Sequence, residues 1–263
     1  MTESYDLIVI GAGPAGYPAA IQAAEWGKKV ACIDRRNPGG CCLNEGCIPM
    51  KTLLHTSQLF RSASQSAAAG VFSAAPGCDF AALAAERESI ISALSDGICM
   101  QFKKNSIDFI TADAVLSGSG EVTVSGDDSR VIHAANILIA AGSAPSLLPV
   151  PGGDLPGLDT STPLLARTAP HRSLTVIGGG VIGMEFASLY TDFGIPVTVL
   201  EAAPGILGAM DRETARSLSM ILKKRGVDIH VSAMVKRIEK DADGTFVCTY
   251  TEKDEEKSCR SEG

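Results

Sequence analysis

Three cysteines lie within seven residues in the stretch GGCCLNEGCIPMK, which covers residues 39–51. Clustered thiols can bind a metal, form a structural disulfide, or form a disulfide that is reduced and reoxidised during turnover. A structural zinc site usually has four ligands in two spaced pairs, and no second pair of cysteines or histidines with suitable spacing follows here. His55, the nearest histidine, is isolated. We therefore expect no metal site.

A bridge between Cys42 and Cys47 would be either structural or redox-active. It would close a very small loop, so a purely structural bridge would stabilise the fold little. A disulfide also needs Cα atoms within about 7 Å, and an undistorted helix holds residues i and i+5 farther apart than that. The local turn must therefore be strained, and a strained bridge is reduced more easily. Lys51 follows in a segment typical of a helix, and a positive charge near a helix N-terminus lowers a thiol pKa. These features favour a redox disulfide. We expect the neighbouring Cys41 to be a bystander, with disulfide shuffling through this third thiol as the alternative.

The segment before the cysteines has the pattern of a dinucleotide-binding unit. In LIVIGAGPAGYPAAIQAAEW, an apolar strand meets Gly11, Gly13 and Gly16 in a G-x-G-x-x-G turn, a helix follows, and the next strand ends at Asp34. The glycines would allow a tight turn, close approach of a pyrophosphate and close helix packing. We expect Pro14 in the first helical turn, where its missing N–H costs nothing, and Asp34 on a ribose hydroxyl.

The same pattern recurs 167 residues later. LTVIGGGVIGMEFASLYTDFGIPVTVLE contains Gly178, Gly180 and Gly183 in the same spacing and ends at Glu201. Two complete units predict two dinucleotides bound at once, which suggests electron transfer between a tightly held flavin and a mobile nicotinamide. Glu201 would repel a 2′-phosphate, so this second site should prefer NAD to NADP.

Length and composition set limits on the other classes of function. The 263 residues suit two domains, the net charge is −7, and no basic cluster suggests a nucleic-acid partner. The apolar runs are too short for a membrane span, and the N-terminus does not resemble a secretory signal, so we expect a cytoplasmic protein. The other cysteines are scattered, and we expect them to be small buried or surface residues rather than working thiols: Cys32, Cys78, Cys99, Cys248 and Cys259.

Four motifs together resemble the pyridine nucleotide-disulfide oxidoreductases, a family that includes dihydrolipoamide dehydrogenase, glutathione reductase and mercuric reductase. GGCCLNEGCIPMK is similar to the family's redox motif, VIGAGPAGY to its FAD turn, ILIAAGSAPSLLPVPG to its crossing segment, and VIGGGVIGMEFA to its NAD turn. The first turn and Glu201 look most like dihydrolipoamide dehydrogenase. Met50 and Ala141 depart from the usual residues without touching the core chemistry.

The resemblance implies FAD and NAD as cofactors and four catalytic residues. Cys42 would be the thiol that exchanges with substrate, Cys47 would face the flavin as the charge-transfer thiolate, and Lys51 and Glu185 would form an ion pair beside flavin N5. Lys51 would therefore also contact the cofactor. The other cofactor contacts implied are Gly11, Gly13, Pro14, Ala15, Gly16, Asp34, Gly40, Ala112, Gly142 and Ser143 for FAD, and Gly178, Gly180, Gly183, Glu201 and Val235 for NAD.

The fold class implied is α/β, with two Rossmann-like three-layer domains of the FAD/NAD(P)-linked reductase type. We expect an incomplete FAD-binding domain over residues 1–148, carrying the redox disulfide, and an incomplete NAD-binding domain over residues 149–263. The family's C-terminal dimerisation domain, with its His–Glu pair, is expected to be absent. None of the four histidines is expected to replace that base; they are His55, His133, His171 and His230.

These features predict a dihydrolipoamide dehydrogenase-like oxidoreductase in cell redox homeostasis, acting on a dihydrolipoyl group or another small dithiol or disulfide. Its full-length form would be a homodimer and could serve a 2-oxoacid dehydrogenase complex. The alternatives left open are a mercuric or glutathione-type reductase and a catalytically incomplete dinucleotide-binding fragment.

Overall fold

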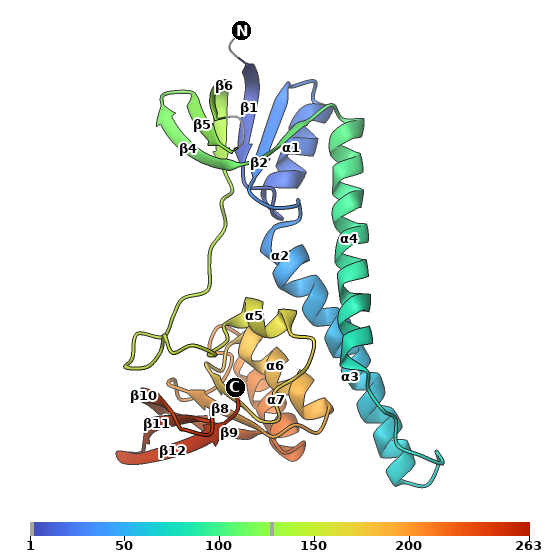
Figure 1. The fold of residues 1–263 in the computed structure, drawn as a ribbon, viewed down its shortest axis with the longest axis vertical. Coiled ribbons are helices and arrows are strands. Elements are labelled where there is room, and N and C mark those ends of the chain that lie inside the picture. The colour runs from blue at the N-terminus through green and yellow to red at the C-terminus, as the bar shows by residue number, and fades with distance from the viewer. Residues whose placement is uncertain (1–2, 127–128) are drawn as a thin grey trace. The chain divides into compact units, whose positions relative to one another are not determined.

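The computed structural model describes residues 3–126 and 129–263, and the chain divides into two compact units. The first unit runs to Pro49 and resumes over Ala85–Ala144. The second contains Met50–Ala84 and Pro145–Gly263. Figure 1 traces the chain through both, from the strands near the N-terminus to those near the C-terminus.

A six-stranded mixed sheet forms the centre of the first unit. Its order is β3-β2-β1-β6-β5-β4, with β1 parallel to β2 and β6, β2 parallel to β3, and β4, β5 and β6 antiparallel. The strands are β1 (Ser4–Ile10), β2 (Val30–Asp34), β3 (Asp108–Thr111), β4 (Asp113–Gly118), β5 (Glu121–Ser125) and β6 (Arg130–Ile139).

Alternate residues of β1 and β2 enter two different cores, as the period of two in a strand requires. Val9 and Cys32 pack with Phe102 in a cluster that involves helices α1 (Gly16–Glu25) and α4 (Phe80–Lys104). Ile8 and Ile33 pack in a second cluster with residues of β5 and β6. The helices therefore cover one face of β1 and β2, and the antiparallel part of the same sheet packs on the other face, which gives the unit three layers.

Helix α2 (Gly40–Glu45) follows β2 in the first unit, and helix α3 (Cys47–Ala68) begins there before continuing into the second unit. Gly46 separates the two helices with φ −144° and ψ −104°, values that interrupt a continuous helix. The long helix α4 covers residues 80–104; Phe102 is buried and Leu94 is exposed.

The second unit repeats the three-layer plan. β7 (Leu174–Ile177), β8 (Val197–Glu201) and β9 (Asp228–Val231) form a parallel sheet, and β10 (Ala233–Lys240), β11 (Phe246–Glu252) and β12 (Glu255–Ser261) form an antiparallel one. The helices here are α5 (Ser161–Ala166), α6 (Val181–Asp192) and α7 (Arg212–Lys224).

Successive residues of β8 again serve two cores. Val199 packs in the cluster that includes Phe186 of α6 and Leu222 of α7, whereas Leu200 packs with Phe246 and Cys248 of the antiparallel sheet. This alternation explains why the neighbouring residues Val199 and Leu200 are both apolar: both faces of the strand are covered.

The α/β class with two Rossmann-like units is confirmed. The division near residue 145 lies close to the expected domain boundary, while residues 50–84 group with the second unit. Pro14 lies just before the regular part of α1, and the Tyr17 N–H donates to Gly13 O at 3.0 Å, so Pro14 lies inside the first hydrogen-bonded turn, as predicted. In the described parts of the chain, no helix is both long and apolar enough to cross a membrane.

Candidate active site

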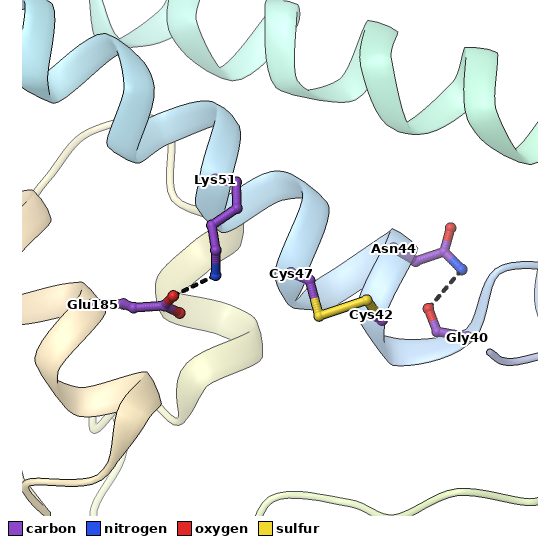
Figure 2. The surroundings of a disulfide bond; sticks show 6 residues. All are labelled: Gly40, Cys42, Asn44, Cys47, Lys51 and Glu185. Carbon is purple, nitrogen blue, oxygen red and sulfur yellow. Dashed lines mark hydrogen bonds and ion pairs between the residues drawn. A yellow bond between two sulfur atoms is a disulfide. The ribbon is translucent and has the colours of Figure 1, made fainter. Parts of the chain in front are cut away.

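A disulfide joins Cys42 of α2 to Cys47, the first residue of α3, with Cα atoms 4.7 Å apart (Figure 2). The break at Gly46 makes this approach possible, because a continuous helix would hold residues i and i+5 farther apart. Cys47 is exposed and Cys42 is partly buried. Cys41 is an exposed free thiol beside the bridge.

Helix α2, which carries Cys42, packs directly against the first glycine turn through glycine residues. Gly40 has φ +60°, and a Cβ there would lie 2.4 Å from Gly13 Cα. The backbone N–H of Gly39 donates to Ala12 O at 2.8 Å. Within α2, the Asn44 side-chain amide donates to Gly40 O at 3.0 Å. The disulfide therefore lies on a helix whose first turn packs on the loop expected to cradle a pyrophosphate.

Each of the three glycines in the first turn is required, or not required, by the fold for a different reason. Gly11 has φ +102°, and a Cβ there would lie 2.2 Å from Ala140 O. A Cβ at Gly16 would lie 1.8 Å from Gly11 O, where the helix meets the strand. At Gly13 a Cβ would make only ordinary contact, with Gly40 Cα at 3.5 Å. The fold itself does not require a glycine there, which fits a position kept bare for a ligand.

The second turn shows the same division more clearly. Gly178 has φ +111°, and a Cβ on Gly183 would lie 2.1 Å from Gly178 O. Gly180 has φ −74°, and a Cβ there would lie in open space, with no atom within 4 Å. Both turns therefore contain one glycine that only a closely approaching ligand would require, as a dinucleotide pyrophosphate does.

The acid that ends each second strand is bonded in the same way in the two units. Asp34 accepts the backbone N–H of Ala12 at 2.8 Å and that of Arg36 at 3.1 Å. Glu201 accepts the N–H of Gly179 and the N–H of Ala203, each at 2.6 Å. Each carboxylate keeps further lone pairs that can accept from ribose hydroxyls. The sequence pattern does not predict these bonds, but the equal spacing of the acid from the turn in both copies is a usable signal.

An ion pair links Lys51 of α3 to Glu185 of α6, and both residues belong to the second unit (Figure 2). The Lys51 side chain is 60% exposed and that of Glu185 is 22% exposed. Cys47 lies one turn before Lys51 on the same helix. A positive side chain thus follows the disulfide closely along α3, and a carboxylate holds that side chain.

A second, buried ion pair holds α3 against α6. The Asp192 carboxylate has no exposed surface and lies 2.8 Å from Arg61 Nε and 3.5 Å from an Arg225 guanidinium nitrogen. The Ser57 hydroxyl donates to it at 3.3 Å. Because a buried carboxylate needs such partners, this cluster fixes the helix that carries Lys51.

The remaining predicted contacts lie in different settings. Ala112 follows β3, and its N–H donates to Asp34 O at 3.0 Å, which places its backbone beside Asp34. Gly142 has φ +72°, and Ser143 next to it is exposed. Ala15 caps the N-terminus of α1. Val235 is buried in the apolar cluster of the second unit.

The described residues contain no group of three or more metal-ligating side chains. His171 and His230 pair with carboxylates in the second unit, through Asp159 at 3.0 Å and Asp228 at 2.9 Å. His133 lies 3.7 Å from Glu121.

Comparison with known proteins gives one consistent assignment. Residues 5–260 match the family model described as pyridine nucleotide-disulphide oxidoreductase. The chain is 34% identical over 244 residues to dihydrolipoyl dehydrogenase of Acholeplasma laidlawii, covering 91% of this chain and 72% of that protein. It is 41% identical over 240 residues to dihydrolipoyl dehydrogenase 3 of Pseudomonas aeruginosa, covering 89% and 51%.

Among solved structures, the Cu(II) complex of the HOCl-induced flavoprotein disulfide reductase RclA from Escherichia coli is similar along the whole chain. The TM-score is 0.84 and the identity 30%, covering 100% of this chain and 56% of that one. The chain thus spans about half the length of most of these relatives.

Proposed function

Because the chain belongs to the pyridine nucleotide-disulfide oxidoreductases, we propose that it acts as a flavin-dependent disulfide oxidoreductase of the dihydrolipoamide dehydrogenase type. Electrons would pass between a dithiol or disulfide substrate, the Cys42–Cys47 pair, FAD and NAD. The observation that carries this proposal is the disulfide on helices α2 and α3, joined through the contact of Gly40 with Gly13 to a turn of dinucleotide-binding form.

The family uses FAD and NAD(H), and the residues present fit both. When bound, FAD supplies two-electron chemistry that connects a dithiol to a nicotinamide. The first turn and Asp34 would hold the FAD pyrophosphate and ribose, and the second turn and Glu201 would hold NAD. Carboxylates at both ribose positions favour free 2′-hydroxyls. We propose residues 1–148 as the FAD-binding domain and residues 149–263 as the NAD-binding domain.

The chain's own cysteines account for the exchange with substrate. One substrate thiolate attacks Cys42 Sγ, the Cys42–Cys47 bond breaks, and Cys47 leaves as a thiolate. The second substrate thiolate then attacks the mixed disulfide and releases Cys42. The balance is one disulfide and one dithiol exchanged for one dithiol and one disulfide, with no other oxidant needed.

The positive charge of Lys51 would stabilise negative charge on the Cys47 thiolate and near the flavin. A cation one helical turn from a leaving thiolate favours the ionised form of that thiol. Glu185 fixes the Lys51 side chain, which would otherwise have several rotamers in solvent. We assign Lys51 and Glu185 a positioning and electrostatic role rather than a covalent one.

We propose a dihydrolipoyl group as the substrate, a homodimer as the full-length form, a 2-oxoacid dehydrogenase complex as a partner and the cytoplasm as the location. The similarity to dihydrolipoyl dehydrogenases supports this choice. The similarity to RclA favours a second candidate, a reductase that works in the direction of disulfide reduction. Both candidates use the same cysteines.

The test is to reduce the purified chain with dihydrolipoamide without oxygen, then alkylate and map the tryptic peptide of residues 37–51. We expect Cys42 and Cys47 to be protected before the dithiol and alkylated after it, while Cys41 is alkylated in both samples. In Cys47→Ser the Cys42 thiol is free, so oxidised lipoamide, itself a disulfide, should replace the dithiol: Cys42 attacks it and forms a mixed disulfide as one lipoyl thiol is released. Cys41→Ser serves as the matched control that leaves the exchange with dihydrolipoamide intact. A Cys42–Cys47 bridge that dihydrolipoamide leaves intact would contradict the proposal.

A further inference from the structure

Two other cysteines face each other across the antiparallel sheet of the second unit. Cys248 of β11 and Cys259 of β12 are register partners, and both are free thiols. The register runs without a shift from Glu252↔Glu255 at the turn to Phe246↔Ser261. Directly opposed residues of an antiparallel pair have side chains on the same face. The register of the hairpin therefore places the two thiols next to each other.

The connecting turn fixes this register. Lys253 and Asp254 are the two loop residues, with φ +54° and +64°. Two successive residues of positive φ form the turn that matches the twist of a two-residue hairpin. Because a shift by one residue would move every side chain to the other face, the turn also holds Cys248 opposite Cys259.

The two sulfur atoms differ in their surroundings. Cys248 is 4% exposed and belongs to the apolar cluster with Phe246 and Tyr250. Cys259 is only partly buried at the margin of that cluster. The Thr175 hydroxyl of β7 lies 3.8 Å from Cys259 Sγ, within hydrogen-bonding distance for sulfur. Cys248 is thus shielded from solvent, whereas Cys259 keeps part of its surface exposed.

The contact between the thiols makes Cys259 the better nucleophile. The hydrogen bond from the Cys248 thiol lowers the pKa of Cys259 against the opposing effect of burial, and Thr175 and His230 lower it further. The same bond, together with burial, raises the pKa of Cys248. Asp228 acts in the opposite sense on Cys259 but is paired with His230 at 2.9 Å. Such an asymmetric pair has one attacking and one resolving thiol.

We propose that Cys248 and Cys259 form a second redox-active dithiol, which small-molecule disulfides oxidise to a cross-strand disulfide. Cys259 attacks the small disulfide, forms a mixed disulfide and releases one thiol. Cys248 then loses its proton, attacks Cys259 Sγ and releases the second thiol. One protein dithiol and one small disulfide become one protein disulfide and two small thiols, so electrons and protons balance.

The geometry favours a reversible bridge. Opposed residues in a sheet have Cα atoms about 4.5–5.5 Å apart, inside the range of disulfides. Their Cβ atoms are about 4.5–5.5 Å apart, at or beyond the upper limit that a disulfide prefers. The bond would therefore draw the strands together under strain, and strained disulfides are the easily reduced ones.

Glutathione disulfide is the probe for the test. The fully reduced chain is incubated with it, alkylated and digested with trypsin. Cleavage after Lys240, Lys253, Lys257 and Arg260 leaves Cys248 in the peptide 241–253 and Cys259 in the peptide 258–260. We expect these two peptides to appear joined, with the loss of two hydrogen atoms. The Cys42–Cys47 bridge stays inside the single peptide 37–51, so failure of either pair is seen separately.

Two variants define the order of events. Cys248→Ser should leave a stable glutathione adduct on Cys259, whereas Cys259→Ser should leave Cys248 unmodified. Cys99→Ser, which removes another free cysteine, is the matched control and should give the joined peptides unchanged. Wild-type protein with adducts on both thiols, on Cys248 alone, or on neither, and no joined peptides, would overturn the proposal whether or not the variants fold.

Discussion

The Asp34 carboxylate accepts the backbone N–H of Ala12 at 2.8 Å, and Glu201 binds the N–H of Gly179 in the same way at 2.6 Å. In both units the acid at the end of the second strand holds the middle of the glycine turn. The position that would bind a ribose therefore also sets the shape of the loop that would bind the pyrophosphate.

Replacing Glu201 with alanine should weaken NADH binding. The change removes two short bonds to backbone N–H groups and the acceptor for a ribose hydroxyl. Hydrogen bonds to charged groups are worth about 1.5–3 kcal/mol each, so affinity should fall about tenfold or more. Calorimetric titration with NADH measures this, and Glu86→Ala, an exposed acid of the first unit, is the control. Unchanged affinity in Glu201→Ala would show that the acid does not shape the site.

Two alanine substitutions in one turn should have opposite effects. Gly180→Ala fills open space at a negative φ, so the free energy of unfolding should change by less than about 1 kcal/mol while NADH affinity drops. Gly183→Ala drives a methyl group into Gly178 O and should destabilise the second unit by about 1–3 kcal/mol. Thermal unfolding and NADH titration of both variants separate the two roles. Normal NADH binding by Gly180→Ala would argue against a pyrophosphate at this turn.

The two ion pairs of α3 should contribute unequally to stability. Asp192 is buried between Arg61 and Arg225, and Asp192→Ala leaves those charges without a partner. Breaking a buried pair in this way costs about 3–5 kcal/mol. Lys51→Met breaks a pair whose lysine is mostly exposed and should cost less than about 1 kcal/mol. Denaturant unfolding of the two variants gives the comparison, and equal losses would contradict this account of the helix.

The carboxylates around His230 predict a pH-dependent stability. Burial lowers its pKa, but the hydrogen bonds to Asp228 and Glu252 outweigh burial and raise it overall. A raised pKa in the folded state means that the protonated imidazole stabilises the fold below the unfolded pKa, near 6.5. This contribution is lost as pH rises through the folded value. The stability difference between the wild type and His230→Gln should therefore shrink from acid to alkaline pH, and a difference that grows would contradict the charged pair.

Short-range patterns predicted much of this fold. The two glycine turns, their strands and the terminal acids could be predicted from residue spacing, because local backbone geometry or local packing determines the residue type at each of these positions. The break at Gly46 between α2 and α3 follows from the demand that Cys42 and Cys47 approach each other. The ion pair between Lys51 and Glu185 follows only from family resemblance, because 134 residues separate its members.

Residue spacing did not predict which residues lie opposite each other in the sheets or contact each other between elements. Cys248 and Cys259 are scattered in the sequence, although Lys253 and Asp254 between them form a hairpin turn. Asp192 gives no signal of burial either, since its partners come from α3 and from the end of α7. The local pattern also placed Pro14 correctly, inside the turn that the Tyr17 N–H closes on Gly13 O at the start of α1.

The visible spectrum of the purified chain during anaerobic titration with dihydrolipoamide tests the central claim most directly. We predict a flavin spectrum that gains long-wavelength absorbance on two-electron reduction, from the Cys47 thiolate beside oxidised FAD. Cys42→Ser should show that absorbance before any reductant is added, and Cys47→Ser should never show it. A chain that retains FAD and is reduced without this absorbance, or that binds no FAD at all, would contradict the assignment of Cys42 and Cys47 as the redox pair of a flavin enzyme.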